Sequence, residues 1–105
     1  MYGSNMEDVF TNPEKTVLAH LTFHHRIQPN EPAVQKIFGN DEAERRKVLT
    51  SLRDRGYIQH YRRNQIDKIE FICPSEMGDR VGRKVIQDFR SGSFTPENGL
   101  QLGDE

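Results

Sequence analysis

The amino-terminal part of the chain repeats its hydrophobic residues at helical spacing. The stripe consists of Val17, Leu18 and Leu21. Such residues share one face of a helix, because positions three to four apart lie above one another. Asn12, followed by Pro13 and Glu14, is typical of a helix start: a capping side chain, a proline in the first turn and an acid near the positive dipole end. The pattern predicts a helix from Asn12 to about Arg26, and Ile27 is a candidate start of a short strand.

Two further helices are expected before the middle of the chain. The first is short, because Asn30 can cap it and Gly39 ends it after about two turns. Its inward residues are Ala33, Val34, Ile37 and Phe38. The second starts where Asp41 and Glu44 stand at the spacing of a capping box, and it ends at Gly56, which can adopt the left-handed conformation. Its inward residues are Val48, Leu49 and Leu52.

After Gly56 the period of the pattern changes from that of a helix to that of a strand. One strand alternates Tyr57, Gln59 and Tyr61 with Ile58, His60 and Arg62. The other alternates Ile69, Phe71 and Cys73 with Lys68 and Glu70. These segments predict an antiparallel hairpin whose tip is formed by residues 63–67, because half-buried strands have a period of two. We expect Cys73 to point inward with Phe71 and Ile69, as an inert buried thiol.

A last helix is expected after Pro74, where Ser75 can cap it. Its apolar stripe consists of Met77, Val81, Val85 and Phe89. We expect this stripe to be buried against the first helix or across a dimer axis. Gly78 and Gly82 each cost about 1 kcal/mol relative to alanine inside a helix, so the close approach of another helix is expected there. That helix is either the first one or part of a second subunit.

Length and composition indicate one small folded domain. The 105 residues are 33% hydrophobic and 30% charged, which is too apolar and too nearly neutral for a wholly disordered chain. Residues 12–90 are expected to form the domain, between a flexible segment at 1–11 and a disordered tail at 91–105. No run approaches the ~18 apolar residues of a membrane span, and a single cysteine agrees with a reducing compartment. A cytoplasmic protein without membrane contact is therefore expected, associated with the nucleoid if it is prokaryotic.

Basic residues are concentrated in the middle of the chain, although the net charge is only −1. They are Arg45, Arg46, Lys47, Arg53, Arg55, Arg62, Arg63 and Lys68. With Asp54 and Asp67 the segment from Arg45 to Lys68 carries +6, and the rest of the chain carries −7. A basic segment in an acidic background is typical of a polyanion-binding surface, because phosphate neutralisation needs only local Lys and Arg. A solvated charged face is the alternative.

The expected order is helix, short strand, short helix, longer helix, two-stranded hairpin and final helix. Residues 46–58 read RKVLTSLRDRGYI and residues 73–78 read CPSEMG. Over residues 13–90 the chain resembles the small winged-helix transcription regulators of bacteria and archaea, of the MarR or PadR kind. The first segment is similar to their recognition helix, and the second to the apolar-Thr-x-x-Gly motif that follows their wing.

The resemblance implies a mostly α fold with a small β-hairpin. This winged helix-turn-helix has a three-helix core, a two- or three-stranded wing and a C-terminal helix. It also implies that a recognition helix at 41–55 enters the major groove, while a wing at 57–73 meets the backbone or the minor groove. One departure is that Asp41, Glu42 and Glu44 put three acids where family members often have small or hydroxylated residues.

The candidate DNA-binding residues come from the recognition helix and the wing. Opposite the apolar stripe, the helix carries Arg46, Lys47, Thr50 and Arg53. Arginine can read guanine edges, and threonine can contact a base or a phosphate. From the wing we expect contacts by Arg62, Arg63, Asn64 and Lys68. Arginine suits a narrow, electronegative minor groove, whereas lysine is a phosphate contact. The alternative is that exposed helices and turns carry such residues for solubility.

The sequence offers little other chemistry. His20 and His24 lie four apart on one helix face with His25 beside them, but no cysteine pair or neighbouring acid completes a metal site, so a polar helix flank is expected. A Ser-His-Asp set, a paired-carboxylate motif and a phosphate-cradling glycine loop are all absent from the sequence, so neither an enzyme nor a cofactor is expected.

The sequence thus predicts a transcriptional regulator that binds double-stranded DNA in a sequence-specific manner. A homodimer through the C-terminal helix is left open, because two-fold operators match two-fold proteins. The alternative is a winged-helix protein-protein interaction module within a larger assembly, with the acids at the start of the third helix as its surface.

Overall fold

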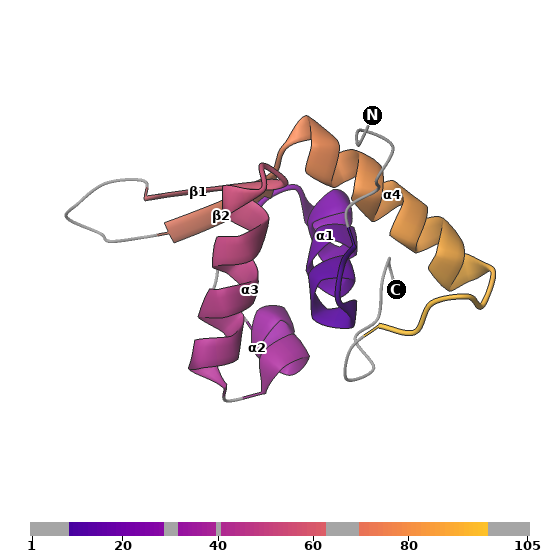
Figure 1. The fold of residues 1–105 in the computed structure, drawn as a ribbon, viewed down its shortest axis with the longest axis horizontal. Helices are drawn as coiled ribbons and strands as arrows, with labels where there is room; N and C mark the ends of the chain where they lie inside the picture. Colours follow the sequence, from indigo (N-terminus) through magenta and orange to yellow (C-terminus); the bar gives the residue numbers. More distant parts are fainter. Residues whose placement is uncertain (1–8, 29–31, 40, 63–69, 97–105) are drawn as a thin grey trace.

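A computed structural model describes residues 9–28, 32–39, 41–62 and 70–96, with the side chains of 60–62, 70 and 71 excepted (Figure 1). The elements are α1 (Asn12–His24), α2 (Pro32–Phe38), α3 (Glu42–Asp54), β1 (Ile58–Arg62), β2 (Glu70–Pro74) and α4 (Glu76–Arg90). The order of helices and strands is the expected one. Helix α1 lies between α3 and α4, and the hairpin projects away from the helices beyond α3 (Figure 1). In the described part of the chain, none of the helices is long and apolar enough to cross a membrane.

Helix α1 is capped one residue earlier than expected. Thr11, rather than Asn12, is the N-cap: its hydroxyl accepts a hydrogen bond from the Glu14 amide at 3.3 Å. In return the Glu14 carboxylate accepts one from the Thr11 amide at 2.8 Å. This reciprocal pair satisfies two of the amides that a helix start leaves without partners. At the other end His25 adopts a left-handed conformation with φ 63°.

The turn between α2 and α3 follows the prediction in part. Gly39 ends α2 with φ 62°, and the Asp41 side chain accepts a hydrogen bond from the Glu44 amide at 2.9 Å. The amide of Asp41 itself donates to the Phe38 carbonyl at 3.1 Å. The Phe38 carbonyl therefore accepts the hydrogen bond from the Asp41 amide that the expected capping box assigned to the Glu44 carboxylate. Asn30, the expected cap of α2, lies outside the described residues.

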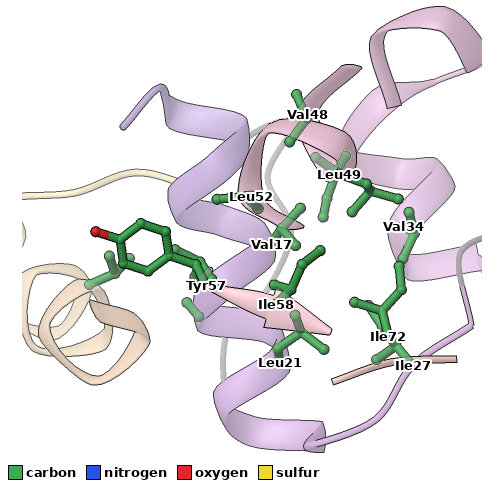
Figure 2. Close-up of a cluster of buried hydrophobic side chains, with 14 of the residues drawn as sticks. Val17, Leu21, Ile27, Val34, Val48, Leu49, Leu52, Tyr57, Ile58 and Ile72 are labelled. Atoms are coloured by element: carbon green, nitrogen blue, oxygen red, sulfur yellow. The ribbon is translucent and has the colours of Figure 1, made fainter. Parts of the chain in front are cut away.

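The hydrophobic core joins the inner face of α3 to α1, α2 and the hairpin. Figure 2 shows Val48, Leu49 and Leu52 of α3 directed toward residues of the other elements. The labelled partners are Val17, Leu21, Ile27, Val34, Ile58 and Ile72, and all of them are at most 3% exposed. Because α3 buries its whole apolar stripe, its opposite face is fixed toward solvent.

The inward face of strand β2 differs from the expectation. Ile72 is fully buried, whereas Cys73 is half-buried and its sulfur lies 3.8 Å from the Gln59 side-chain oxygen. Cys73 pairs with Gln59 across the hairpin, and successive residues of a strand point to opposite faces. The expectation of an inward Cys73 is therefore wrong. Ile27 determines which residues of β2 point inward, since it exchanges two backbone hydrogen bonds with Ile72, at 2.9 and 2.8 Å.

Helix α4 packs on α1 through its glycines. The Ser75 hydroxyl accepts a hydrogen bond from the Gly78 amide at 3.1 Å, as its expected capping role requires. Gly78 and Gly82 are buried. A Cβ at Gly82 would meet Thr22 and the Leu18 backbone of α1, whereas a Cβ at Gly78 would meet the Tyr57 backbone first and the Leu18 side chain at 3.4 Å. The glycine spacing left open whether the neighbouring helix is the first one or part of a second subunit, and in the structure it is α1.

The buried stripe of α4 is shifted from the expected one. Met77 is 44% exposed, whereas Val85 and Ile86 are 3% and 7% exposed. Met77 therefore does not pack on α1, and of its two expected burial sites only a dimer axis stays a prediction. Val81 and Phe89 are partly buried against the core.

Residues on both sides of the expected domain are also held by contacts. Phe94 packs against the core, and the Asn12 side chain donates to the Thr95 carbonyl at 2.8 Å. Phe10 meets the Tyr57 ring edge to face, with 4.9 Å between the ring centroids. Residues 10, 94 and 95 thus contact the domain, and the expected flexible and disordered segments stay predictions. The remaining parts of those segments lie outside the described residues.

Removing residues 91–105 is therefore expected to lower the melting temperature by several degrees, because Phe94 and the buried Pro96 lose their contacts. Each 1 kcal/mol lost corresponds to about 4–8 °C for a domain of this size. Removing residues 97–105 alone is expected to have a much smaller effect. Thermal unfolding followed by circular dichroism compares the two truncations, and equal melting temperatures would contradict a role of residues 91–96.

Candidate nucleic-acid interface

The outward face of α3 carries the residues expected to meet DNA. Arg46, Lys47 and Arg53 are exposed, and Thr50 is half-buried. They form one stripe because residues three to four apart share a helix face. The stripe is rigidly oriented, since the opposite face is locked into the core. The structure thus brings together the four candidates that the sequence assigned to this helix.

Arg53 has an acidic neighbour that leaves it available to a ligand. Its guanidinium lies 3.5 Å from the Asp54 carboxylate, and the side chains of the two residues are 50% and 66% exposed. Exposed pairs of this kind are worth about 0–1 kcal/mol. A phosphate or a base edge can therefore compete for the arginine.

Two other basic residues of the middle segment are engaged inside the domain. Arg45 lies 3.3 Å from Glu42 with a side chain that is 18% exposed. Arg55 lies 3.3 Å from Glu14, whose side chain is 8% exposed. The three-residue spacing of Glu42 and Arg45 is a sequence signal for the first pair. The second pair joins residues 41 positions apart, and nothing in the local sequence reveals it. Among the basic residues of this segment whose side chains are described, the exposed ones are therefore Arg46, Lys47 and Arg53.

The hairpin leaves α3 by a short and well-fixed connection. Gly56 adopts φ 86°, and the Tyr57 amide donates to the Leu52 carbonyl at 2.9 Å. Ser75 holds the far end, since its hydroxyl donates to the Gly56 carbonyl at 2.6 Å and its amide to the Tyr57 carbonyl at 3.0 Å. The direction of the hairpin is therefore determined by the end of α3 (Figure 1).

The expected wing contacts cannot be compared with the described side chains. Arg62 is the last residue of β1, and its side chain is outside the described part. Arg63, Asn64 and Lys68 lie outside the described residues altogether. They stay predictions.

Acidic residues surround the amino-terminal end of α3, as the sequence indicated. Asp41 and Glu42 are exposed, and they line a hollow of about 180 Å³ together with Gln35, Phe38, Gly39 and Arg45. The carboxylate of Glu42 is balanced by Arg45, and that of Asp41 caps the helix. The basic stripe thus begins one turn into α3.

The histidines of α1 do not assemble with other metal ligands. The rings of His20 and His24 lie 4.4 Å apart between centroids, with His20 buried and His24 exposed. Among the described residues, no group of three or more His, Cys, Asp or Glu side chains is arranged to hold a metal ion.

Three solved structures are similar to this chain in fold. The adhesin competence repressor AdcR of Streptococcus pyogenes has a TM-score of 0.67 and 14% identity over 79% of this chain. ZitR of Lactococcus lactis, solved as a double mutant, has a TM-score of 0.64 and 13% identity over 87% of this chain. The F-93 protein of SSV1 has a TM-score of 0.62 and 18% identity over 83% of this chain. The matches span 60% of AdcR, 60% of ZitR and 96% of F-93.

Comparison of the sequence alone gives no match. No protein-family model matches the chain, and the search of curated proteins finds no match. AdcR and ZitR are regulators of the MarR family, and F-93 is a winged-helix protein. The likeness in fold, together with four helices and an antiparallel hairpin in the expected order, establishes that this chain has the winged helix-turn-helix fold of those regulators.

Proposed function

We propose that the chain is a transcriptional regulator that binds double-stranded DNA in a sequence-specific manner, with α3 in the major groove. The observation that carries this proposal is the exposed stripe of Arg46, Lys47 and Arg53, with Thr50 beside them, on a helix whose other face is buried. An α-helix with its side chains fits the major groove of B-form DNA. Arginine and threonine on its outer face can then reach base edges, and the lysine can neutralise a phosphate.

The hairpin supplies the second part of the proposed surface. It projects from the carboxyl end of α3 (Figure 1), where a wing would meet the backbone or the adjacent minor groove. Arg62, Arg63, Asn64 and Lys68 are the residues that we propose for these contacts. Asp41, Glu42 and Glu44 lie at the other end of α3, away from the start of the hairpin, whereas Asp54 stands beside Arg53 at this end.

The similar structures support a regulatory role without extending it to a particular site or ligand. AdcR is named a repressor. Its chain and that of ZitR are longer than the part matched here, so their activities as whole proteins are not carried over.

A homodimer through α4 is a second, separate proposal. Val85 is buried within the domain, so a change there would disturb the core of the single chain. Met77 is 44% exposed on the same helix, and it is therefore the suitable probe of a subunit interface. Sedimentation velocity of the parent and of Met77→Glu at equal concentration compares their masses. An entirely monomeric parent at high concentration would contradict a dimer.

The direct test of DNA binding is an electrophoretic shift assay with random duplexes at low salt. The parent is expected to retard the duplexes, and Arg46→Ala/Lys47→Ala is expected to weaken binding strongly, because phosphate contacts dominate non-specific affinity. The matched control is Arg80→Ala/Arg90→Ala, which removes the same charge from exposed residues of α4. We expect it to bind nearly as the parent does. No retardation of the parent would contradict the proposal and favour a protein-protein interaction module.

A further inference from the structure

Arg55 connects four parts of the molecule just beyond the end of α3. One guanidinium nitrogen lies 3.3 Å from the Glu14 carboxylate of α1 and 3.5 Å from the Ser51 hydroxyl of α3. The other donates to the Val9 carbonyl at 3.0 Å. The guanidinium carbon lies 4.6 Å from the centre of the Phe10 ring and 5.5 Å from that of Tyr57, the residue before β1. We call Arg55, Glu14, Val9 and Phe10 the clasp.

The acceptor side of the clasp is built into the start of α1. Glu14 is 6% exposed, and its carboxylate has both oxygens engaged. One accepts from the Thr11 amide of the capping box, and the other from Ser51 at 3.2 Å and Arg55. A buried carboxylate with this many partners holds its arginine in one place, because removing either partner would leave a charge without compensation.

We propose that Arg55 is a positioning residue of the DNA-binding surface: through the clasp it fixes the angle at which α3 passes into the hairpin. This inference rests on the proposed function. Arg55 belongs to the basic segment that the sequence singles out. Its guanidinium nevertheless points to Glu14 of α1 and to Val9, which precedes α1. It therefore orients the two DNA-contacting elements and does not contact a phosphate.

The clasp is placed where a small shift has a large effect on the proposed surface. Gly56 and Tyr57 are the two residues between Arg55 and β1, so a change at Arg55 alters the direction of the whole hairpin. The α3 stripe and the hairpin can meet one duplex together only when that direction is correct. Loss of the clasp should therefore reduce affinity by misplacing the contacts of the hairpin, although Arg55 itself makes none.

The test uses the full chain with Glu14→Gln/Arg55→Met. Glutamine keeps an acceptor for Thr11, and methionine keeps an apolar stem against Phe10 and Tyr57. The net charge is unchanged, and no buried charge is left unpaired. Lys84→Met/Asp88→Asn is the matched control, since it removes an ion pair of 2.8 Å from α4 with the same charge balance. Arg53→Met serves as the comparison for loss of a proposed contact.

We expect the clasp variant to bind DNA about 3- to 30-fold more weakly, the range typical of residues that act from outside a binding site. In a background that already carries Arg62→Ala/Arg63→Ala the clasp variant should cost little more, because the contacts that it misplaces are already gone, whereas Arg53→Met should keep its full cost there. The α4 control should bind as the parent does. All measurements are made well below the melting temperature of each variant.

Two results would overturn the inference. A clasp variant that costs the same affinity with and without Arg62 and Arg63 would act independently of the hairpin, and an unchanged affinity would reduce the clasp to a stabilising role. If the parent itself binds no DNA, the proposed function fails separately. Amide hydrogen exchange then tests whether the clasp fixes the connection between α3 and the hairpin. Faster exchange at Gly56 and Tyr57 in the variant supports this role, and unchanged exchange contradicts it.

Discussion

Gly82→Ala is expected to destabilise the domain by about 1–3 kcal/mol, because an added methyl group overpacks the contact between α1 and α4. A Cβ at Gly82 would lie 2.5 Å from the Leu18 carbonyl oxygen and 3.1 Å from its carbon. Carbon atoms are in optimal contact at about 3.5–4.0 Å, so the helices would have to move apart. The backbone of Leu18 cannot turn aside as a flexible side chain would.

The sign of this change is what makes it informative. In an open helix, alanine is more favourable than glycine by about 1 kcal/mol, so a loss of stability reports the close approach of α1. Gln87→Ala, an exposed change on the same helix, is the control and should stay within about 0.5 kcal/mol of the parent. Urea unfolding measures all three proteins. A Gly82→Ala protein more stable than the parent would contradict the described packing.

The second large effect concerns how base reading and phosphate neutralisation divide over the proposed DNA surface. Arg46→Ala or Thr50→Ala should cost about 1–3 kcal/mol on a duplex selected for tight binding, and less on random DNA, if the residue contacts a base. Arg62→Ala/Arg63→Ala should weaken both duplexes. If both arginines contact phosphates, the slope of log affinity against log salt should become shallower by about 2.

Fluorescence anisotropy titrations over a range of salt concentrations supply both quantities. An arginine in the minor groove would instead show partial dependence on sequence through groove width. The division fails if all four substitutions leave binding intact. It fails most clearly if Glu42→Lys or Glu44→Lys meanwhile abolishes association with a protein partner.

Local capping chemistry made most helix boundaries predictable from the sequence. Asp41 and Ser75 cap α3 and α4 as expected, because a cap needs only residues within one turn. At α1, Thr11 and Asn12 are both competent caps. The reciprocal bond with Glu14 decides for Thr11, and that signal, a threonine three residues before a glutamate, was present in the sequence.

The residues of β2 that point toward the core were harder to predict from the sequence. Phe71, Ile72 and Cys73 follow one another without a polar residue, so alternation alone allows either phase. The bridge from Ile27 selects Ile72, and that contact joins residues far apart in the chain. The same limit applies to the candidate site. The outward stripe of α3 follows from helical periodicity, whereas the ion pair of Arg55 depends on Glu14 of another helix.

The packing of α1 on α4 also has a consequence for the order in which the molecule is made. Among the described elements, helix α1 is synthesised first and its partner α4 last. The contact of Leu18 with Gly78 and Gly82 can therefore form only after these glycines have been synthesised. Closing so long a stretch of chain is slow compared with forming local helices and hairpins. On the ribosome, α3 and the hairpin can form before α1 is covered on its α4 side. The emerging chain should then present an apolar surface to chaperones until residue 90 has left the exit tunnel.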